Sequence, residues 1–251
     1  MLQLVALEKS FGSVSVLRGI SVDFQPGETV GLIGPNGSGK TTLVNVVTGL
    51  FGPSAGQVLF QGEDIAGRSP HDISRLGMAR TFQNLRLFSR MTVMENVDAA
   101  RHGMPGNHLY QLMFGDRQTA KLARQKTEWA MEQVGLQDDR DRLAKSLPLP
   151  QLRRLEIARV LARDPQLVFL DEPAGGMTPR ESEEMARLIA ERVAPERTCI
   201  IIEHKMDLIR QVCPRICVLS AGGLIADGAP AEVFALPEVI EAYLGRETVH
   251  A

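Results

Sequence analysis

The stretch Gly34-Pro35-Asn36-Gly37-Ser38-Gly39-Lys40-Thr41 decides the fold, because it places a glycine-rich turn between a short apolar run and a segment with helical periodicity. Glycines let successive backbone N–H groups turn inward around phosphate oxygens, and the positive end of the following helix adds to that attraction. Lys40 can then reach the β- and γ-phosphates, while the Thr41 hydroxyl can hold Mg²⁺. The alternative, a glycine-rich turn with a surface lysine, is disfavoured by the flanking strand and helix patterns. The sequence therefore predicts that residues 34–42, Thr42 included, bind a nucleoside triphosphate.

A second stretch, Gln166-Leu167-Val168-Phe169-Leu170-Asp171-Glu172, is an apolar run that ends in two carboxylates. At the exit of a strand, Asp171 is placed to coordinate Mg²⁺, directly or through water. Glu172 is the natural general base for the attacking water. Two acids in this position can also cap the next helix, but Thr178-Pro179-Arg180-Glu181 already supplies a capping box with proline at the first helical position. We therefore assign both acids to chemistry.

Short β-branched or apolar runs alternate with helical patterns along the chain, which indicates an α/β fold with a largely parallel sheet. The predicted strands are 29–33, 57–60, 166–170, 198–202 and 216–220, and the clearest helical patterns are 181–193 and 205–212. The opening segment differs from the rest. Strands near 2–7 and 20–24, joined through Phe11-Gly12-Ser13, predict an antiparallel layer.

Between about residues 92 and 162 the strand signals disappear and the chain becomes polar and helical. Thr92 and Glu95 form a capping box, so a helix is predicted to begin at Val93. The segment from Gly103 to Gly106 ends it, and a long charged helix is predicted over about 115–134. We interpret this region as a helical subdomain inserted into the α/β core. The last stretch, 229–251, is a small tail with a helical run at 239–244.

Bulk composition limits the functions that the chain can have. The 251 residues are 44% hydrophobic and 23% charged, and the formal net charge of −2 leaves no basic excess for neutralising nucleic-acid phosphates. We interpret the scattered arginines as lying on solvated helix faces. No apolar run approaches the ~18–20 residues that span a bilayer, and no secretory signal opens the chain. Any membrane role is expected to come through a partner.

Three cysteines, Cys199, Cys213 and Cys217, do not have the spacing of a zinc site, and Pro214 lies between the two that a helix face would bring together. We therefore expect buried thiols in a reducing compartment rather than a metal site.

Three further residues stand, relative to these motifs, in the order found in the ATP-binding cassette family, which the chain resembles along nearly its whole length. Phe11 stands where that family places an aromatic ring against adenine, and core packing is the alternative for it. Gln83, within ARTFQNLRLF, matches a glutamine that reaches Mg²⁺ and water and links the core to the helical subdomain. His204, within IIEHKM, matches a histidine that contacts the γ-phosphate.

This resemblance implies a phosphate-loop NTPase fold with ATP and Mg²⁺ as cofactors. A RecA-like core with its antiparallel β layer would occupy residues 1–85 and 159–228, the helical subdomain 86–158 and the tail 229–251, all within one ATPase domain. Thr41, Gln83 and Asp171 would hold the metal ion. Gln83, Glu172 and His204 would serve catalysis.

The strings ARTFQNLRLF, RRLEIAR, EPAGGMTP, IIEHKM and VIEAYLG look like those of ATPase subunits in branched-chain amino acid importers. That resemblance implies transmembrane permease subunits as direct partners, an external substrate-binding protein as an indirect one, and a place on the cytoplasmic face of the inner or plasma membrane. No nucleic-acid partner is expected. Two alternatives are a soluble cassette ATPase that remodels DNA or ribosomes and a pseudo-ATPase that acts as a nucleotide-gated binding module. The first usually carries fused cassettes or coiled-coil insertions, and the intact catalytic motifs weigh against the second.

One segment departs from the family. A signature close to LSGGQ should precede RRLEIAR, but the stretch here is Leu147-Pro148-Leu149-Pro150-Gln151. In the family two subunits pair head to tail, and each ATP lies between one subunit's phosphate loop and the other's signature. There a serine hydroxyl and a glycine N–H reach the γ-phosphate. Pro148 has no hydroxyl, neither proline has an N–H, and Leu149 adds bulk.

The chain's own half-site is therefore expected to be complete, and the half-site that it lends to a partner to be weakened. We favour a second, different ATPase subunit as partner. A helix is predicted to begin near Gln151, with Pro150 in its first turn. A milder departure is Met177-Thr178, which replaces the usual Leu-Asp of the family's D-loop, although Thr178 can still cap a helix.

Overall fold

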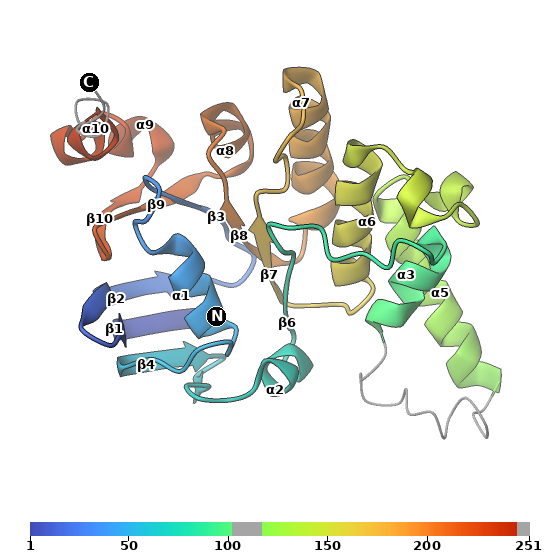
Figure 1. The fold of residues 1–251 in the computed structure, drawn as a ribbon, viewed down its shortest axis with the longest axis horizontal. Helices are drawn as coiled ribbons and strands as arrows, with labels where there is room; N and C mark the ends of the chain where they lie inside the picture. The colour runs from blue at the N-terminus through green and yellow to red at the C-terminus, as the bar shows by residue number, and fades with distance from the viewer. Residues whose placement is uncertain (102–116, 245–251) are drawn as a thin grey trace.

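The computed structural model describes residues 1–101 and 117–244, and in that part of the chain two sheets and a group of helices are arranged side by side (Figure 1). Four strands form an antiparallel sheet in the order β2-β1-β4-β5. They are β1 (Leu2–Phe11), β2 (Val14–Phe24), β4 (Ala55–Phe60) and β5 (Glu63–Asp64). The predicted antiparallel layer is confirmed. Its first two strands are longer than predicted, because their pairing continues to Phe11 and Val14 on either side of the turn.

Within the same described ranges, six strands form the second sheet in the order β10-β9-β3-β8-β7-β6. They are β3 (Thr29–Ile33), β6 (Met78–Arg80), β7 (Leu167–Asp171), β8 (Thr198–Ile202), β9 (Arg215–Ser220) and β10 (Gly223–Gly228). Neighbouring strands are parallel, apart from the β9–β10 hairpin. β3, β7 and β8 are buried along their whole length, as in sheets covered on both faces. The largely parallel sheet is confirmed.

The parallel sheet separates two hydrophobic clusters. Phe169 of β7 and Ile200 of β8 pack into a cluster with α1 (Lys40–Val47) and the antiparallel sheet. Their neighbours on the other face, Val168 and Ile201, pack into a cluster with α6 (Leu149–Leu161), α7 (Pro179–Leu188) and α8 (Met206–Val212). This alternation from residue to residue follows from the two-residue period of a strand.

Helices α3 (Val93–Ala100), α5 (Arg117–Gln133) and α6 lie together at one end of the molecule, on the right in Figure 1. α3 begins at the predicted residue and carries the predicted capping box of Thr92 and Glu95. The predicted break from Gly103 to Gly106 lies outside the described residues. The prediction for α6 was two residues late, because Pro148 already takes the N-cap position and Leu149 begins the helix.

Other helices of four to eight residues precede β6 and follow β10. α2 (Pro70–Arg75) precedes β6, and α9 (Pro230–Val233) and α10 (Pro237–Leu244) follow β10, so the predicted tail helix is confirmed. α7 has the predicted capping box of Thr178 and Glu181 and continues as a π-helical turn, Ile189–Val193. The 3₁₀ turns Gln137–Asp139 and Ala144–Ser146 connect α5 to α6.

The interpretation of the arginines as solvated was wrong for several of them. Arg153 and Arg197 are 9% and 8% exposed, and burial lowers the pKa of Arg80, Arg159 and Arg163. Their guanidinium groups donate to neighbouring backbone or side-chain oxygens, as Arg153 does to the Gln83 carbonyl at 3.1 Å. The planar group carries five donors, and this allows it to satisfy several oxygens away from water.

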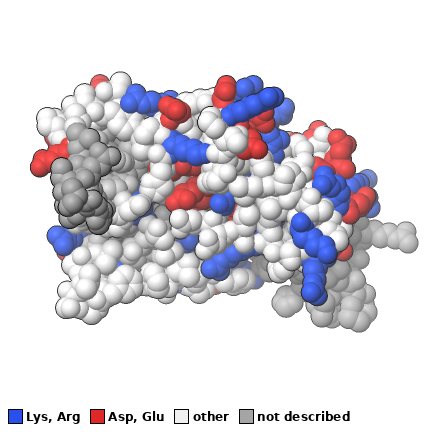
Figure 2. Space-filling model, turned by 45° about the horizontal axis from the view of Figure 1, so that its top comes forward, with Lys and Arg blue, Asp and Glu red and all other residues white. Residues whose placement is uncertain are grey.

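On the face shown in Figure 2, basic and acidic side chains are interspersed rather than gathered by sign. Within residues 1–101 and 117–244, no helix is both long enough and apolar enough to serve as a membrane span. The three cysteines are free and buried, as predicted, and burial raises the pKa of Cys199 and Cys213 to about 12.

Candidate active site

The phosphate loop connects the carboxyl end of β3 to the first turn of α1. Gly34 has φ 148°, and a Cβ there would lie 2.1 Å from the Leu219 carbonyl oxygen, so only glycine fits. Gly39 is the N-cap of α1 with φ 107°, and no side chain of the described residues caps the helix. The first N–H groups of α1 are therefore available to an anion. Ser38 Oγ is buried in the loop and has no hydrogen-bond partner within the described part of the chain.

The side chain of Lys40 packs back against the phosphate loop. It is buried, and its ammonium donates to the carbonyl oxygens of Gly34 at 2.7 Å and Pro35 at 3.1 Å. Asn36, Gly37 and Thr41 are exposed and Thr42 is half-buried. The structure thus brings the predicted residues 34–42 together as one loop and helix start.

Hydrogen bonds connect this loop to the β9–β10 turn and, through that turn, to β2. The Gly222 N–H, in the β9–β10 turn, donates to the Ser38 carbonyl at 3.1 Å, and the Arg18 N–H of β2 donates to the Gly222 carbonyl at 2.9 Å. A Cβ at Gly222 would lie 2.3 Å from the Val16 carbonyl oxygen. Both sheets therefore fix the position of the phosphate loop.

Strand β7 ends in Asp171, which lies 5% exposed at the carboxyl end of the parallel sheet. The backbone N–H of Asp171 donates to Thr81 Oγ1 at 2.9 Å. Burial raises the pKa of Asp171, and the nearby Arg80 guanidinium opposes that rise. A carboxylate that is short of solvation in this way is suited to a bound cation.

Glu172 is the point at which the predicted catalytic residues meet. Gln83 Nε2 donates to Glu172 Oε1 at 2.9 Å, and His204 Nε2 lies 3.4 Å from the same oxygen. Glu172 has φ 47°, a left-handed conformation that non-glycine residues rarely adopt, and its N–H donates to the Ile202 carbonyl at 2.8 Å. The side chains of Glu172 and His204 are 23% and 44% exposed, so both are accessible to a ligand.

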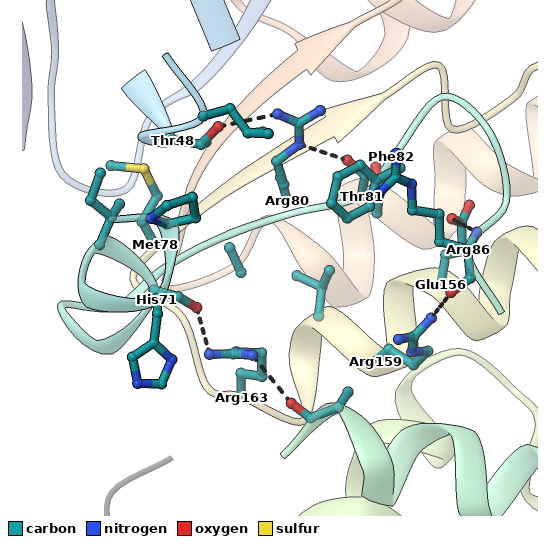
Figure 3. Close-up of a pocket in the computed structure, with 17 residues that line it drawn as sticks. Thr48, His71, Met78, Arg80, Thr81, Phe82, Arg86, Glu156, Arg159 and Arg163 are labelled. Carbon is teal, nitrogen blue, oxygen red and sulfur yellow. Dashed lines mark hydrogen bonds between the residues drawn. The ribbon is translucent and has the colours of Figure 1, made fainter. Parts of the chain in front are cut away.

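Beside Gln83 lies a cavity of about 340 Å³, with α2 and β6 on one side and α6 on the other (Figure 3). Phe82 lines it, and the guanidinium groups of Arg80 and Arg86 lie over its ring, 4.6 and 4.5 Å from the centroid. Arg159 and Arg163 approach from the end of α6. Four arginines therefore line a cavity whose other lining residues are mostly apolar.

Glu156 is the acidic group of the cavity wall. It is 5% exposed, accepts a hydrogen bond from Arg153 Nη1 at 3.1 Å, and lies 3.4 Å from the Arg86 N–H. Burial raises the pKa of Glu156, while Arg153 opposes the rise. Arg163 donates to Ser74 Oγ of α2 and to the Ala100 carbonyl of α3 at 3.2 Å. These contacts of Arg163 thus connect α2 to the helical end of the molecule.

Phe11 stands at the end of β1 and is 42% exposed, so the core-packing alternative for this ring was wrong. Its ring meets that of Phe51 edge to face, with centroids 5.2 Å apart, and Lys9 Nζ lies 4.9 Å from its centroid. An exposed ring with a neighbouring cation is suited to a planar ligand that carries phosphates.

The altered signature, residues 147–151, lies at the start of α6. Leu147 is buried, Pro148 is the exposed N-cap and Pro150 lies in the first turn of the helix. Leu149 packs against the loop after β7, where a Cβ at Gly176 would lie 2.9 Å from Leu149 Cδ2. Gln151 Nε2 donates to Asp139 Oδ2 at 3.2 Å.

Sequence reasoning missed three residues that support the site. Arg153 donates to the Gln83 carbonyl, and Lys205 donates to the Met177 carbonyl. Glu203 accepts the backbone N–H groups of Ala174, His204 and Lys205. Most of their partners are backbone groups far along the chain, which leave no mark in the sequence. For Glu203 alone there was a signal, a carboxylate directly after a fully buried strand.

Two features define a phosphate-loop nucleoside triphosphatase. One is a glycine-rich loop between a parallel strand and a helix, and the other is a carboxylate pair at the end of another strand of the same sheet. Comparison with known proteins gives the family. A model of the ABC transporter family matches residues 17–175, and a model of branched-chain amino acid ATP-binding cassette transporters matches residues 224–249. The chain belongs to the ATP-binding cassette family, whose members bind ATP and are ATPases.

Curated relatives match over nearly the whole chain. The high-affinity branched-chain amino acid transport ATP-binding protein LivG of Escherichia coli (strain K12) is 39% identical over 251 residues, covering 98% of each chain. The corresponding protein BraF of Pseudomonas aeruginosa is 37% identical over 249 residues, again covering 98% of each. The solved ADP conformation of an ATP-binding cassette of an ABC transporter superposes with a TM-score of 0.85 at 32% identity, covering 98% of each chain. The predicted phosphate-loop NTPase fold is thereby confirmed.

Proposed function

We propose that the chain is the ATP-hydrolysing subunit of a membrane importer of branched-chain or related amino acids. The meeting of Gln83, Glu172 and His204 at one carboxylate oxygen carries this proposal, because a protein that only bound nucleotide would not need a base with its own orienting partners. The near full-length similarity to LivG and BraF, both named for branched-chain amino acid transport, supports the choice of cargo.

In this proposal the loop of residues 34–42 holds the phosphates of ATP. Backbone N–H groups of the loop and of the first turn of α1 donate to phosphate oxygens, and Lys40 exchanges its carbonyl partners for the β- and γ-phosphates. Phe11 stacks on the adenine ring, a contact worth roughly 1–3 kcal/mol that tolerates different bases.

Magnesium fits the site by the chemistry of its donors. The Thr41 hydroxyl, the Asp171 carboxylate and the Gln83 amide oxygen are the hard oxygen ligands that Mg²⁺ prefers. Within the described residues no group of three His, Cys, Asp or Glu side chains could hold a metal ion by itself. In this proposal the phosphates of the nucleotide would complete the coordination. A bound ion there supplies positive charge to the β- and γ-phosphate oxygens.

For hydrolysis we assign three roles around Glu172. Glu172 accepts the proton of the attacking water. Gln83 orients the Glu172 carboxylate by donating to Oε1. His204, whose Nε2 lies 3.4 Å from that oxygen, contacts the γ-phosphate. Arranging these groups before the reaction is how such sites gain most of their rate, since little covalent chemistry falls to the protein.

We further propose a core at residues 1–85 and 159–228, a helical subdomain at 86–158 and a tail at 229–251. The cavity beside Gln83 is lined from both the core and the subdomain, which favours it as the seat of a permease segment. A permease held there would place the chain on the cytoplasmic face of the membrane, with an external substrate-binding protein as an indirect partner.

The altered signature favours a second, different ATPase subunit. In a head-to-tail dimer each nucleotide needs donors from the partner's signature. Pro148 and Pro150 carry no N–H, and the dipole of α6 offers only about 0.3–1 kcal/mol to a phosphate. A partner with an intact signature would complete the site built on this chain's Lys40 and Glu172.

The proposal is tested by purifying an affinity-tagged full chain from detergent-solubilised membranes of the organism that encodes it. We expect transmembrane permease subunits and a second ATPase to copurify. Reconstituted with an external binding protein, the complex should take up leucine, isoleucine or valine when ATP is supplied, and a matched complex with Glu172→Gln should not. Copurification without any permease, or ATP-dependent uptake of an unrelated cargo alone, would contradict the proposal.

A further inference from the structure

The residues on either side of His204 both reach the loop that follows Glu172. Glu203 is 2% exposed, and its carboxylate accepts the Ala174 N–H at 3.0 Å on one oxygen. Its other oxygen accepts the N–H groups of His204 at 2.8 Å and Lys205 at 3.2 Å. A buried carboxylate is tolerated where it is hydrogen-bonded in this way. Glu203 therefore ties the backbone at His204 to the backbone two residues after Glu172.

Lys205 makes a second connection to the same region. Its ammonium donates to the Met177 carbonyl at 2.7 Å and to Ser182 Oγ, in α7, also at 2.7 Å. The side chain is half-buried. Thus the contacts of Glu203 and Lys205 fall at Ala174 and Met177, near both ends of the turn that leads from Glu172 to α7.

His204 itself stands in a short connection between the end of β8 at Ile202 and the start of α8 at Met206. Its own ring is 44% exposed and lies 3.4 Å from Glu172 Oε1. The ring is therefore held in place less by packing than by the backbone from which it projects. That backbone is fixed by the strand, the helix and the two side-chain connections.

We propose that Glu203 and Lys205 are positioning residues that fix His204 and Glu172 relative to each other for attack on the γ-phosphate. Neither touches the reacting atoms. Both act by setting the spacing between the backbone at His204 and the loop 173–178. The inference rests on the proposed role of His204 in hydrolysis. A misplacement of about 1 Å at a catalytic group can cost about 10²-fold in rate, so loss of either connection should act on turnover rather than on nucleotide binding.

The test uses the full chain purified with its transporter subunits and the variants Lys205→Met and Glu203→Gln. Lys205→Met keeps a long side chain but removes the donors, and Glu203→Gln keeps the shape but presents an amide to backbone N–H groups. We expect kcat for ATP to fall about 10- to 100-fold, with KM and the melting temperature close to those of the unaltered complex. Lys121→Met and Glu132→Gln, both exposed on α5, are the matched controls. They should leave kcat, KM and the melting temperature unchanged.

Each variant is also combined with His204→Ala. If the connections act through His204, the double variant should be no slower than His204→Ala alone. Multiplying losses, a rise in KM that accounts for the fall in rate, or full activity of Lys205→Met would overturn the inference. An unaltered rate for His204→Ala itself would instead remove the proposed role of His204, so the two failures can be told apart.

Discussion

At the scale of single residues, Lys40 is held by its own loop and is the proposed donor to the phosphates of the nucleotide. Its ammonium donates to the Gly34 and Pro35 carbonyls, which keeps it beside the first turn of α1. Charged phosphate oxygens make stronger acceptors than neutral carbonyls, so the nucleotide is expected to take over this donor. We expect Lys40→Ala to abolish tight binding of Mg-ATP in calorimetry, whereas Lys121→Met on the exposed face of α5 should bind normally. Retained micromolar affinity would contradict the phosphate-loop assignment.

A substitution at Glu172 is expected to separate nucleotide binding from turnover. In Glu172→Gln the amide oxygen can still accept the hydrogen bond from Gln83 Nε2, so the geometry is preserved while the ability to take a proton is lost. We expect Mg-ATP affinity within a few-fold of the original and steady-state hydrolysis lower by about 10²–10⁴. Calorimetry and phosphate release on the same preparation measure the two quantities. Hydrolysis near the original rate would place the base elsewhere.

The sequence predicted this site where a residue type and its position carry the chemistry. Lys40, Asp171 and Glu172 follow from motifs at the ends of strands, and the family resemblance added Gln83 and His204. The approach of Gln83 and His204 to the same oxygen of Glu172 could not be predicted. It depends on the left-handed turn at Glu172 and on contacts across the sheet. The supporting Arg153 was also missed, because its bond to the Gln83 carbonyl requires a fold that brings the two segments together.

At the scale of elements, the sequence predicted best those that carry their own boundaries. β3 and β8 are five-residue apolar runs and were predicted in full, and α3 and α7 were located by capping boxes. β6 was missed, since its three residues form a strand only through pairing with β7. The strands that were predicted too short extend because of tertiary pairing, which no local pattern reveals.

Arg215 joins several of these elements. It donates to both carboxylate oxygens of Asp227 in β10, at 2.6 and 2.7 Å, and to Glu28 before β3 and the Asp23 carbonyl of β2. The hydrogen bonds from Arg215 hold the pKa of Asp227 below its ordinary value of 3.8, although burial opposes them. Since the folded pKa is the lower one, the ionised pair stabilises the fold above about pH 4, and this is lost as the pH falls through the folded pKa.

We therefore expect Asp227→Asn to lower the free energy of unfolding by about 1 kcal/mol at pH 7, a value reduced by the partial exposure of the pair. The difference from the unaltered chain should shrink as the pH is lowered toward 3. Urea denaturation at several pH values measures it, with Asp138→Asn in the exposed turn before α6 as the control. A difference that is independent of pH would show that Asp227 acts through packing and not through its charge.

At the scale of the whole molecule, the cavity beside Gln83 is the proposed contact with the permease. Arg86 is exposed and lines the cavity, with its guanidinium over Phe82, whereas Arg90 is also exposed but does not line the cavity. We expect Arg86→Glu to reduce the amount of permease that copurifies by at least about tenfold, while Arg90→Glu and Mg-ATP binding by both variants stay near the original. Equal losses of copurifying permease for both variants would indicate a general effect of charge.

A separate expectation concerns the membrane itself. The isolated chain should not bind protein-free lipid vesicles.

The altered signature is the basis for the proposed pairing of this chain with a different ATPase subunit. In a homodimer, Pro148-Leu149-Pro150 would face both γ-phosphates, and both sites would lack donors that stabilise charge in the transition state. Losing one such donor typically costs about 10²–10³ in rate, so the isolated chain should hydrolyse ATP very slowly. A partner with an intact signature would restore the site built on this chain's Lys40 and Glu172, which leaves one competent site and one weak site in the heterodimer.

The substitutions Pro148→Ser, Leu149→Gly and Pro150→Gly, made together, restore the family signature and test this asymmetry in the purified chain. Pro148 is the N-cap of α6, where serine is favoured, and this offsets part of the cost of glycine in the first turn. Leu149→Gly removes the contact with Gly176, so the melting temperature must be followed alongside activity. We expect turnover to rise at least tenfold, consistent with regaining ~1.4 kcal/mol of transition-state stabilisation. Brisk turnover by the unaltered chain, with no gain on restoration, would show that residues 147–151 are a working variant and would remove the case for a different partner.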